Sequence, residues 1–214
     1  MGPLGELELR IPEVMAKTRT PGVSFAVVQR GRLVWRRGFG TADVESGRLV
    51  DADTVFEAGS MSKPVFAYAV MQLCARGAMD LDTPLTKYTP DRVLTGDSRL
   101  ESVTARHVLS HTSGFQNWRS QGKPLSIAFT PGSKHMYSGE GYWYLQSVVS
   151  RLKGRTDAGQ CGRYEGDVEV CATDIDEYLR SNVLRPLGMK SSGYEWNEKW
   201  RARAARGHDA EGRA

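Results

Sequence analysis

Two apolar segments separated by two residues constrain the fold of this 214-residue chain more than any other feature of its sequence. Residues 23–29 (VSFAVVQ) and 32–38 (RLVWRRG) read as β-strands, and Arg30 and Gly31 between them suit a two-residue turn. We therefore predict an antiparallel hairpin. Because a lone hairpin is marginal in water and leaves unpaired edges, it requires a larger sheet. The sequence has no second hairpin signal of this strength. We therefore expect the chain to be the N-terminal part of a longer one.

A buried helix is predicted next, between Gly59 and Gly77. Pro64 falls in the first turn, where proline is tolerated, and Gly77 is a typical C-terminal stop. Apolar residues wrap most of the helix between them, which is typical of a helix buried on nearly all sides. The longest unbroken apolar run, residues 65–71, is too short to cross a bilayer, so no membrane span is expected.

Further helices and one long loop follow. Thr104 can cap a short helix that ends near Ser110. Core helices are predicted over residues 139–152 and 173–184, and the glycine- and proline-rich residues 113–133 are predicted to form a long loop. These elements indicate the α+β class. Because no linker is long enough to separate two domains, we expect a single domain over the whole chain.

Charge and cysteine content argue against several functional classes. The 29 basic and 25 acidic side chains leave a net charge of +4, and the scattered basic residues do not favour a nucleic-acid partner. Residues 199–206 (KWRARAAR) are interpreted as a solvated helix face. The three cysteines lack the spacing of a zinc site, so no metal or cofactor is expected. Cys161 and Cys171 could form a disulfide in an oxidising compartment or stay reduced.

The N-terminal segment does not identify the cellular compartment of the protein. Residues 1–10 carry Glu6 and Glu8 where an export signal would have a basic start and an apolar run. Either the protein stays inside the cell or a leader was removed. The oligomeric state is not predicted.

Ser60 and Lys63, at the start of the predicted buried helix, are the leading candidates for catalysis. Residues three apart lie on one face of a helical turn, so one side chain can reach the other. A lysine can take the proton of a serine hydroxyl where burial or another cation lowers the lysine's pKa. Free N–H groups at a helix N-terminus favour an oxyanion, so the Ser60 amide is a natural half of an oxyanion hole.

The spacing alone does not identify a site. Ser120 and Lys123 share it, but they lie in a loop with no apolar helix behind them. Ser60 could also be an ordinary cap beside a solvated Lys63. Tyr137 supplies a second element, because a tyrosine oxygen flanked by a lysine ammonium can be held partly ionised and act as a base. An isolated tyrosine would more often only pack and form hydrogen bonds.

Three motifs occur in the order seen in one family, with further matches around them. They are residues 56–64 (FEAGSMSKP), 109–114 (LSHTSG) and 137–139 (YSG), supported by 21–22 (PG), 38–40 (GFG), 81–85 (LDTPL) and 186–189 (PLGM). On these motifs the chain resembles the serine beta-lactamase and penicillin-binding protein superfamily, on its class C-like side with the related esterases and D-aminopeptidases. The resemblance spans nearly the whole chain.

The resemblance implies acyl transfer through a covalent serine ester. Ser60 would attack a carbonyl, Lys63 and Tyr137 would share the proton transfers, and water would release the acyl group. The partner would be a small-molecule ester or amide. The implied fold is an antiparallel sheet flanked by helices, with a mostly helical region and the motifs between them.

Two departures from the family pattern narrow this expectation. The tyrosine motif of class C beta-lactamases ends in Asn, whose amide helps to hold the substrate amide, whereas this chain has Gly139. Ester or peptide-like substrates are therefore expected more than lactams. The family also has a later Lys/His-Thr/Ser-Gly triplet, which supplies the other oxyanion-hole N–H, but residues 190–193 (KSSG) have one residue too many. We expect this chain to lack the C-terminal strands and to be impaired as an enzyme.

Aromatic residues near the motifs have two interpretations. Gly139 and Trp118 are candidate substrate-binding residues. Trp118 could line an acyl pocket, as could Tyr142, Trp143 and Tyr144, but at least half of these four side chains are expected to fill the core.

Two rival hypotheses remain. His111 could form a Ser-His-Asp arrangement with Asp80 or Asp82, but the resemblance implies a structural turn there, so a packed or hydrogen-bonded histidine is preferred. The chain could also be a non-catalytic or truncated relative that binds an acyl or peptidoglycan-like ligand or a protein partner.

Overall fold

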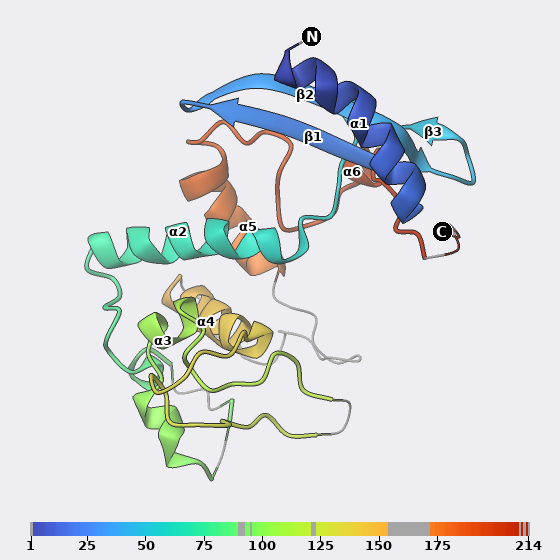
Figure 1. The fold of residues 1–214 in the computed structure, drawn as a ribbon. Helices are drawn as coiled ribbons and strands as arrows, with labels where there is room; N and C mark the ends of the chain where they lie inside the picture. Colours follow the sequence, from blue (N-terminus) through green and yellow to red (C-terminus); the bar gives the residue numbers. More distant parts are fainter. Residues whose placement is uncertain are drawn as a thin grey trace. The chain divides into compact units, whose positions relative to one another are not determined.

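The predicted hairpin is present, and its second strand is longer than predicted (Figure 1). Strand β1 (Gly22–Gln29) pairs antiparallel with β2 (Arg32–Asp43). Arg30 and Gly31 have φ values of 50° and 73°, and positive values at both positions match the twist of the flanking strands. The predicted hairpin and its turn are confirmed.

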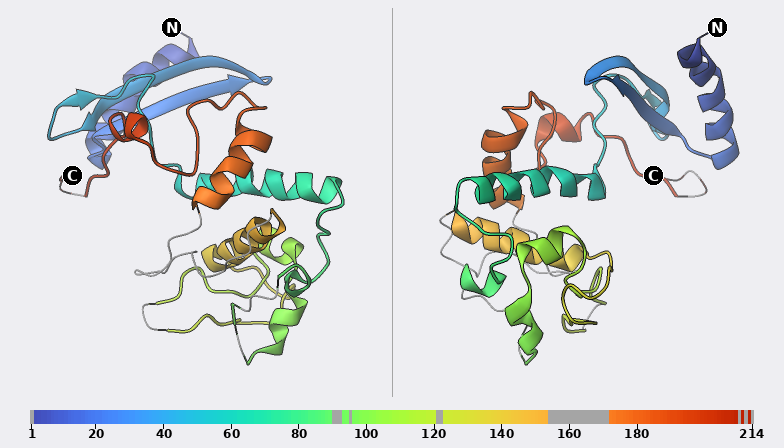
Figure 2. Two further views of the ribbon diagram at one scale, coloured as in Figure 1. Left: turned by 180° about the vertical axis from the view of Figure 1, so that it is seen from behind. Right: turned by 60° about the vertical axis from the view of Figure 1, so that its left-hand side comes forward.

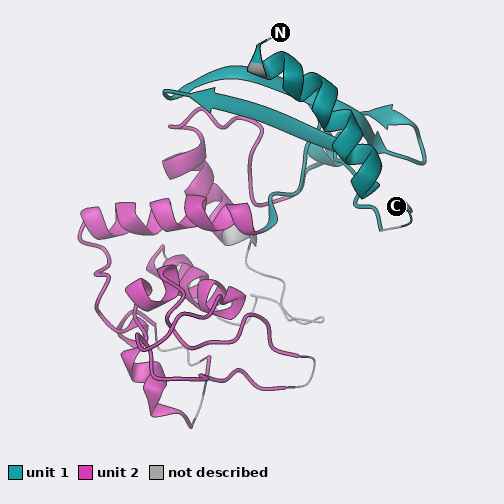
Figure 3. Ribbon diagram, viewed as in Figure 1, with its two compact units in different colours: residues 1–59, 196–214 teal, residues 60–195 magenta. Residues whose placement is uncertain are grey.

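The computed structural model describes residues 2–89, 93–94, 96–120, 123–153, 172–209, 211 and 213. The chain divides into two compact units, residues 1–59 with 196–214 and residues 60–195 (Figure 3). The helical elements are α1 (Pro3–Thr18), η1 (Gly59–Met61), α2 (Ser62–Ala75), η2 (Leu85–Lys87), η3 (Ser98–Ser102), α3 (Ala105–Leu109), α4 (Gly139–Leu152), α5 (Ala172–Leu179), η5 (Arg180–Leu184) and α6 (Glu198–Arg201). None of the helices in these described ranges is long and apolar enough to span a bilayer.

The first unit contains a strand and a helix that the sequence analysis did not predict. Strand β3 (Arg48–Leu49) pairs with β2, so the sheet order is β1-β2-β3. Helix α1 lies beside the hairpin (Figure 2). There the Glu8 carboxylate accepts a hydrogen bond from the Trp35 indole at 3.3 Å and pairs with Arg37 at 2.6 Å.

The segment after α6 completes this unit. Val55 forms a parallel bridge with Ala204. The Val55 N–H donates to the Arg203 carbonyl at 3.0 Å, and the Val55 carbonyl accepts from the Ala205 N–H at 2.8 Å. The unit is therefore built from two parts of the chain that are far apart in sequence.

The core of the second unit is formed by one face of α2 together with α4 and α5. Its buried side chains include Phe66, Ala69, Val70 and Leu73 of α2, Leu145, Val148 and Val149 of α4, and Ile175 and Leu179 of α5. The α2 residues follow the spacing of one helical face, whereas Tyr68 and Met71 are 48% and 47% exposed on the other side. The predicted helix is confirmed, but its predicted burial on nearly all sides is wrong at these two positions.

The other predicted elements of this unit are also present. Thr104 caps α3, where its side chain accepts from the His107 N–H and the His107 ring accepts from the Thr104 N–H. Helix α4 has the predicted bounds, and α5 continues into the π-helical η5 as the predicted third helix. The described part of the loop 113–133 is irregular apart from a bridge between Phe115 and Ile127.

Candidate active site

Ser60 and Lys63 lie together where η1 leads into α2. Ser60 belongs to η1 and is exposed, and Lys63 lies in the first turn of α2 and is half-buried. The Lys63 ammonium donates a hydrogen bond to Ser60 Oγ at 3.1 Å. The spacing of three residues therefore brings the two groups into direct contact, as proposed from the sequence.

Tyr137 contacts the same hydroxyl from the segment that leads into α4. Its phenolic OH lies 2.7 Å from Ser60 Oγ, within hydrogen-bond distance. The Lys63 nitrogen lies 4.8 Å from the centre of the Tyr137 ring and 5.5 Å from that of Tyr142. A hydroxyl, an ammonium and a phenol thus converge, although the tyrosine lies 77 residues from the serine along the chain.

The charge of the lysine changes the acidity of the tyrosine. Hydrogen bonding from Lys63 is the main cause that lowers the pKa of Tyr137 below its ordinary value of 10, and hydrogen bonding to Ser60 lowers it further. A lowered pKa makes the phenolate form of a tyrosine more accessible near neutral pH, and the phenolate is the form that can accept a proton. Both groups that could exchange a proton with the Ser60 hydroxyl therefore lie within hydrogen-bond distance of it.

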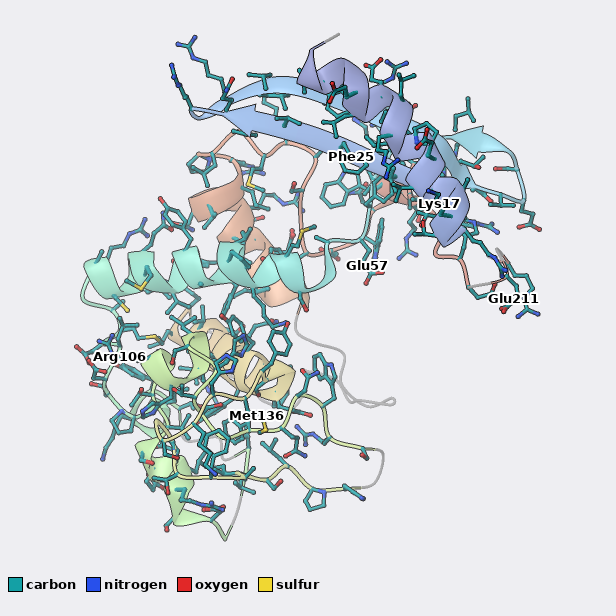
Figure 4. The ribbon with its side chains drawn as sticks, viewed as in Figure 1. Lys17, Phe25, Glu57, Arg106, Met136 and Glu211 are labelled. Carbon is teal, nitrogen blue, oxygen red and sulfur yellow. The ribbon has the colours of Figure 1, made fainter. Side chains whose placement is uncertain are left out.

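His111 holds the segment that carries Tyr137. Its Nδ1 accepts a hydrogen bond from the Ser138 N–H at 3.1 Å, and its carbonyl accepts from the N–H of Met136 at 2.8 Å (Met136 is labelled in Figure 4). The His111 ring lies 4.4 Å from the Tyr137 ring, centre to centre, at an interplanar angle of 33°. These contacts fix the backbone on both sides of Tyr137.

The histidine is neutral in this arrangement and does not complete a Ser-His-Asp triad. Burial, then the charges of His135 and Lys63, lower the pKa of His111 below 6.5. The Asp82 carboxylate instead pairs with Arg106 at 2.6 Å. The preferred interpretation, a packed and hydrogen-bonded histidine, is therefore correct.

Tyr194 supports the serine-lysine turn from a position that sequence reasoning missed. Its hydroxyl donates to the Ser62 carbonyl at 2.8 Å, and its N–H donates to Asp176 Oδ1 at 2.6 Å. Burial is the main cause that raises the pKa of Tyr194 to about 12, with Asp176 contributing. Tyr194 therefore stays protonated and keeps donating this hydrogen bond. Its position in the sequence carries no local signal of this contact.

Trp118 covers Gly139, the last residue of the tyrosine motif. A Cβ atom on Gly139 would lie 2.6 Å from both Cη2 and Cζ2 of the Trp118 ring. Trp118 is 51% exposed, whereas Tyr144 is fully buried and Tyr142 and Trp143 are half-buried. Of the four aromatic candidates, Tyr144 lies in the core and the half-buried Tyr142 packs against it, whereas Trp118 remains a candidate for substrate contact.

The second S-x-x-K pair is joined by a hydrogen bond between its backbone groups. The Lys123 N–H donates to the Ser120 carbonyl at 2.9 Å, and both residues are exposed. In the described parts of the chain, no three His, Cys, Asp or Glu side chains cluster as metal ligands. Cys74 is a free thiol there, whereas Cys161 and Cys171 lie outside the described residues.

Comparison with known proteins adds a family and a fold to this geometry. The profile of the family described as beta-lactamase matches residues 7–214. Esterase EstB of Burkholderia gladioli is 37% identical over 196 residues, which cover 89% of this chain and 41% of the esterase. A beta-lactamase of Yersinia enterocolitica is 35% identical over 199 residues, which cover 87% of this chain and 48% of that protein.

The fold matches solved structures over nearly the whole chain. The octameric penicillin-binding protein homologue of Pyrococcus abyssi superposes with a TM-score of 0.76 at 26% identity, covering 99% of this chain and 50% of that one. The predicted α+β, beta-lactamase-like fold is therefore confirmed. The chain spans about half the length of the relatives it matches, or somewhat less.

Proposed function

Because the chain belongs to the beta-lactamase family, we propose that it contributes a serine hydrolase site in which Ser60 forms an acyl-enzyme with an ester or amide substrate. The observation that carries this proposal is the contact of one hydroxyl with two proton-transfer groups. Ser60 Oγ lies 3.1 Å from the Lys63 nitrogen and 2.7 Å from the Tyr137 oxygen.

The proposed reaction has two steps. In acylation, Ser60 Oγ bonds to the substrate carbonyl carbon and its proton passes to the pair formed by Lys63 and Tyr137. The pair then protonates the leaving alcohol or amine as its bond to that carbon breaks. In deacylation, water attacks the carbonyl carbon of the Ser60 ester while the same pair accepts a proton from the water. The pair then returns this proton to Ser60 Oγ as the bond from Oγ to the acyl carbon breaks and the carboxylic acid leaves.

The start of α2 supports the developing negative charge. The Ser60 N–H lies at the N-terminal end of a helical segment, where unpaired N–H groups and the helix dipole favour an anion. We propose this N–H as one oxyanion-hole donor. Loss of one such donor typically costs about 100- to 1000-fold in turnover, and the sequence contains no Lys/His-Thr/Ser-Gly triplet to supply the second. The 214-residue chain by itself is therefore expected to be slow.

Esters are the preferred substrate class. Gly139 has no side-chain amide with which to hold a lactam or peptide amide. The relative that is 37% identical is named as an esterase. The alternative function is that of a non-catalytic relative that binds an acyl ligand. Ester hydrolysis that falls in both Ser60 and Tyr137 variants would exclude this candidate.

Covalent labelling tests the nucleophile. A fluorophosphonate should label the protein, and Ser60→Ala should abolish the label. Ser120→Ala is the matched control, because Ser120 has the same S-x-x-K spacing without the tyrosine contact. A label of unchanged intensity in Ser60→Ala would reject the proposal.

A further inference from the structure

Neighbouring atoms leave no room for a side chain at Gly139, whereas its backbone conformation does not require glycine. It begins α4, where helical φ and ψ angles suit any ordinary residue. A Cβ atom there would nevertheless lie 2.6 Å from two atoms of the Trp118 ring and 2.9 Å from the Asn117 carbonyl oxygen. The indole therefore occupies the space that a side chain at position 139 would need.

The residues on both sides of Trp118 are fixed to the first turn of α4. The Asn117 carbonyl accepts hydrogen bonds from the N–H groups of Gly139 and Glu140, each at 3.0 Å, and Asn117 Oδ1 also accepts from Gly139 at 3.0 Å. Arg119 donates its backbone N–H, Nε and Nη2 to the Glu140 carboxylate at 3.0, 2.9 and 2.8 Å. Glu140 is only 3% exposed, so this ion pair is largely shielded from water.

The tryptophan between these two fixed residues is not buried. Trp118 is 51% exposed, although the residues on either side of it are held in place. An aromatic ring that is already ordered loses little conformational entropy when an apolar group binds to it. Gly139 lies two residues from Tyr137, so the indole packs against the segment that carries the tyrosine in contact with Ser60.

We propose that Trp118 determines substrate specificity: it excludes a side chain at position 139 and offers an indole surface to the apolar acyl or alcohol group of an ester. This inference rests on the proposed role of Ser60 as nucleophile. A small amide or lactam without such a group would gain nothing from the indole, and it would find no amide side chain at position 139.

A stability measurement tests the packing without using activity. Gly139→Ala should lower the Tm of the protein by about 2–8 °C, because an added methyl group overpacks the contact. In a Trp118→Ala background the same change should cost clearly less, since the two nearest atoms that crowd the methyl group are then gone. An equal loss of Tm in both backgrounds would overturn the proposed packing.

Ester hydrolysis tests the specificity. Trp118→Ala should lower kcat/KM for p-nitrophenyl octanoate by about 10-fold or more, because an apolar contact in a pocket is worth about 10- to 200-fold. If the indole contacts the acyl group, kcat/KM for p-nitrophenyl acetate should change by less than about 3-fold, and Trp118→Phe should retain most of the preference. Trp196→Ala, which removes another exposed tryptophan, is the control.

A second series distinguishes the two ends of the ester. Acetate esters of methanol, butanol and benzyl alcohol vary only the alcohol. Dependence on Trp118 in the p-nitrophenyl series assigns the indole to the acyl group, and dependence in this series assigns it to the alcohol. Equal loss across both series would overturn the inference while leaving Ser60 as the nucleophile.

Binding to an inactive variant separates the two proposals. In Ser60→Ala, ligand-detected NMR should report binding of p-nitrophenyl octanoate, and adding Trp118→Ala should raise its Kd by about 10-fold or more. An unchanged Kd would overturn the inference even if no ester is cleaved. Hydrolysis that persists in Ser60→Ala would reject the proposed function instead.

Discussion

The two halves of the candidate site are built in different ways. Ser60 and Lys63 are three residues apart at the start of α2, and their contact follows from helix geometry. Tyr137 is 77 residues from Ser60, and His111 and the first turn of α4 hold the segment that carries it. The first half therefore depends on local structure and the second on tertiary contacts.

This difference indicates where each half is vulnerable. Changes outside α2 should disturb the tyrosine more than the serine-lysine pair, because the tyrosine is held by hydrogen bonds from other segments. The four predictions below test whether the halves act as one unit and how strongly each depends on its surroundings.

The largest effect is expected from removing the proton-transfer groups. Lys63→Met and Tyr137→Phe should each lower kcat/KM for an ester by about 100- to 10,000-fold, the usual contribution of general acid-base catalysis. If the two residues act as one pair, the double variant should lose little more than either single variant. Tyr68→Phe, an exposed tyrosine on α2, is the control. Losses that multiply in the double variant would show that the halves act independently.

A smaller effect is expected at His111. Its φ of 57° lies in the left-handed region, which Asn adopts more readily than most residues, so His111→Asn preserves the backbone and removes the ring. Loss of the Nδ1 hydrogen bond should lower the free energy of unfolding by about 1 kcal/mol at neutral pH. Thermal unfolding measures this change.

The same variant should lose part of the pH dependence of stability. The folded pKa of His111 lies below 6.5, so its stabilisation is fully present above pH 6.5 and is lost as the pH falls toward the folded pKa. The Tm of the unmodified protein should therefore fall more than that of His111→Asn between about pH 7.5 and about pH 5. Parallel pH profiles would contradict the role of the neutral ring.

The smallest effect is a shift in a titration curve. Because Lys63 is the main cause of the lowered pKa of Tyr137, Lys63→Met should move that pKa back up toward 10. Ionisation of the phenol can be followed by its ultraviolet absorbance, as the difference between each protein and its Tyr137→Phe counterpart. The onset should move to higher pH in Lys63→Met, and an unmoved onset would show that the lysine does not tune the tyrosine.

Much of the fold could be predicted because its signals are local. The turn at Arg30-Gly31, the Thr104 cap and the apolar face of the helix from Gly139 are each set by neighbouring residues. β3 was missed because two residues carry no periodic signal. Helix α1 was not predicted, because residues 1–10 were considered only as an export signal, although Ile11 of α1 is buried.

The candidate site was predictable from local signals only in part. Ser60 and Lys63 follow from helical spacing, and Tyr137 follows from the ordered motifs. The contact of Trp118 with Gly139, and that of Tyr194 with the Ser62 carbonyl, join residues whose separation in sequence carries no rule. Such contacts are decided by packing, which no local pattern encodes.

The hydrogen bond from Tyr194 to Ser62 also bears on the order in which the site is completed. The two residues are separated by 132 positions, and Tyr194 is itself held by Asp176 of the late helix α5. During translation, Ser60 leaves the ribosome long before Tyr194, which stabilises the adjoining turn, has been synthesised. The turn that carries the serine therefore lacks the hydrogen bond from Tyr194 during most of the time needed to translate the second unit.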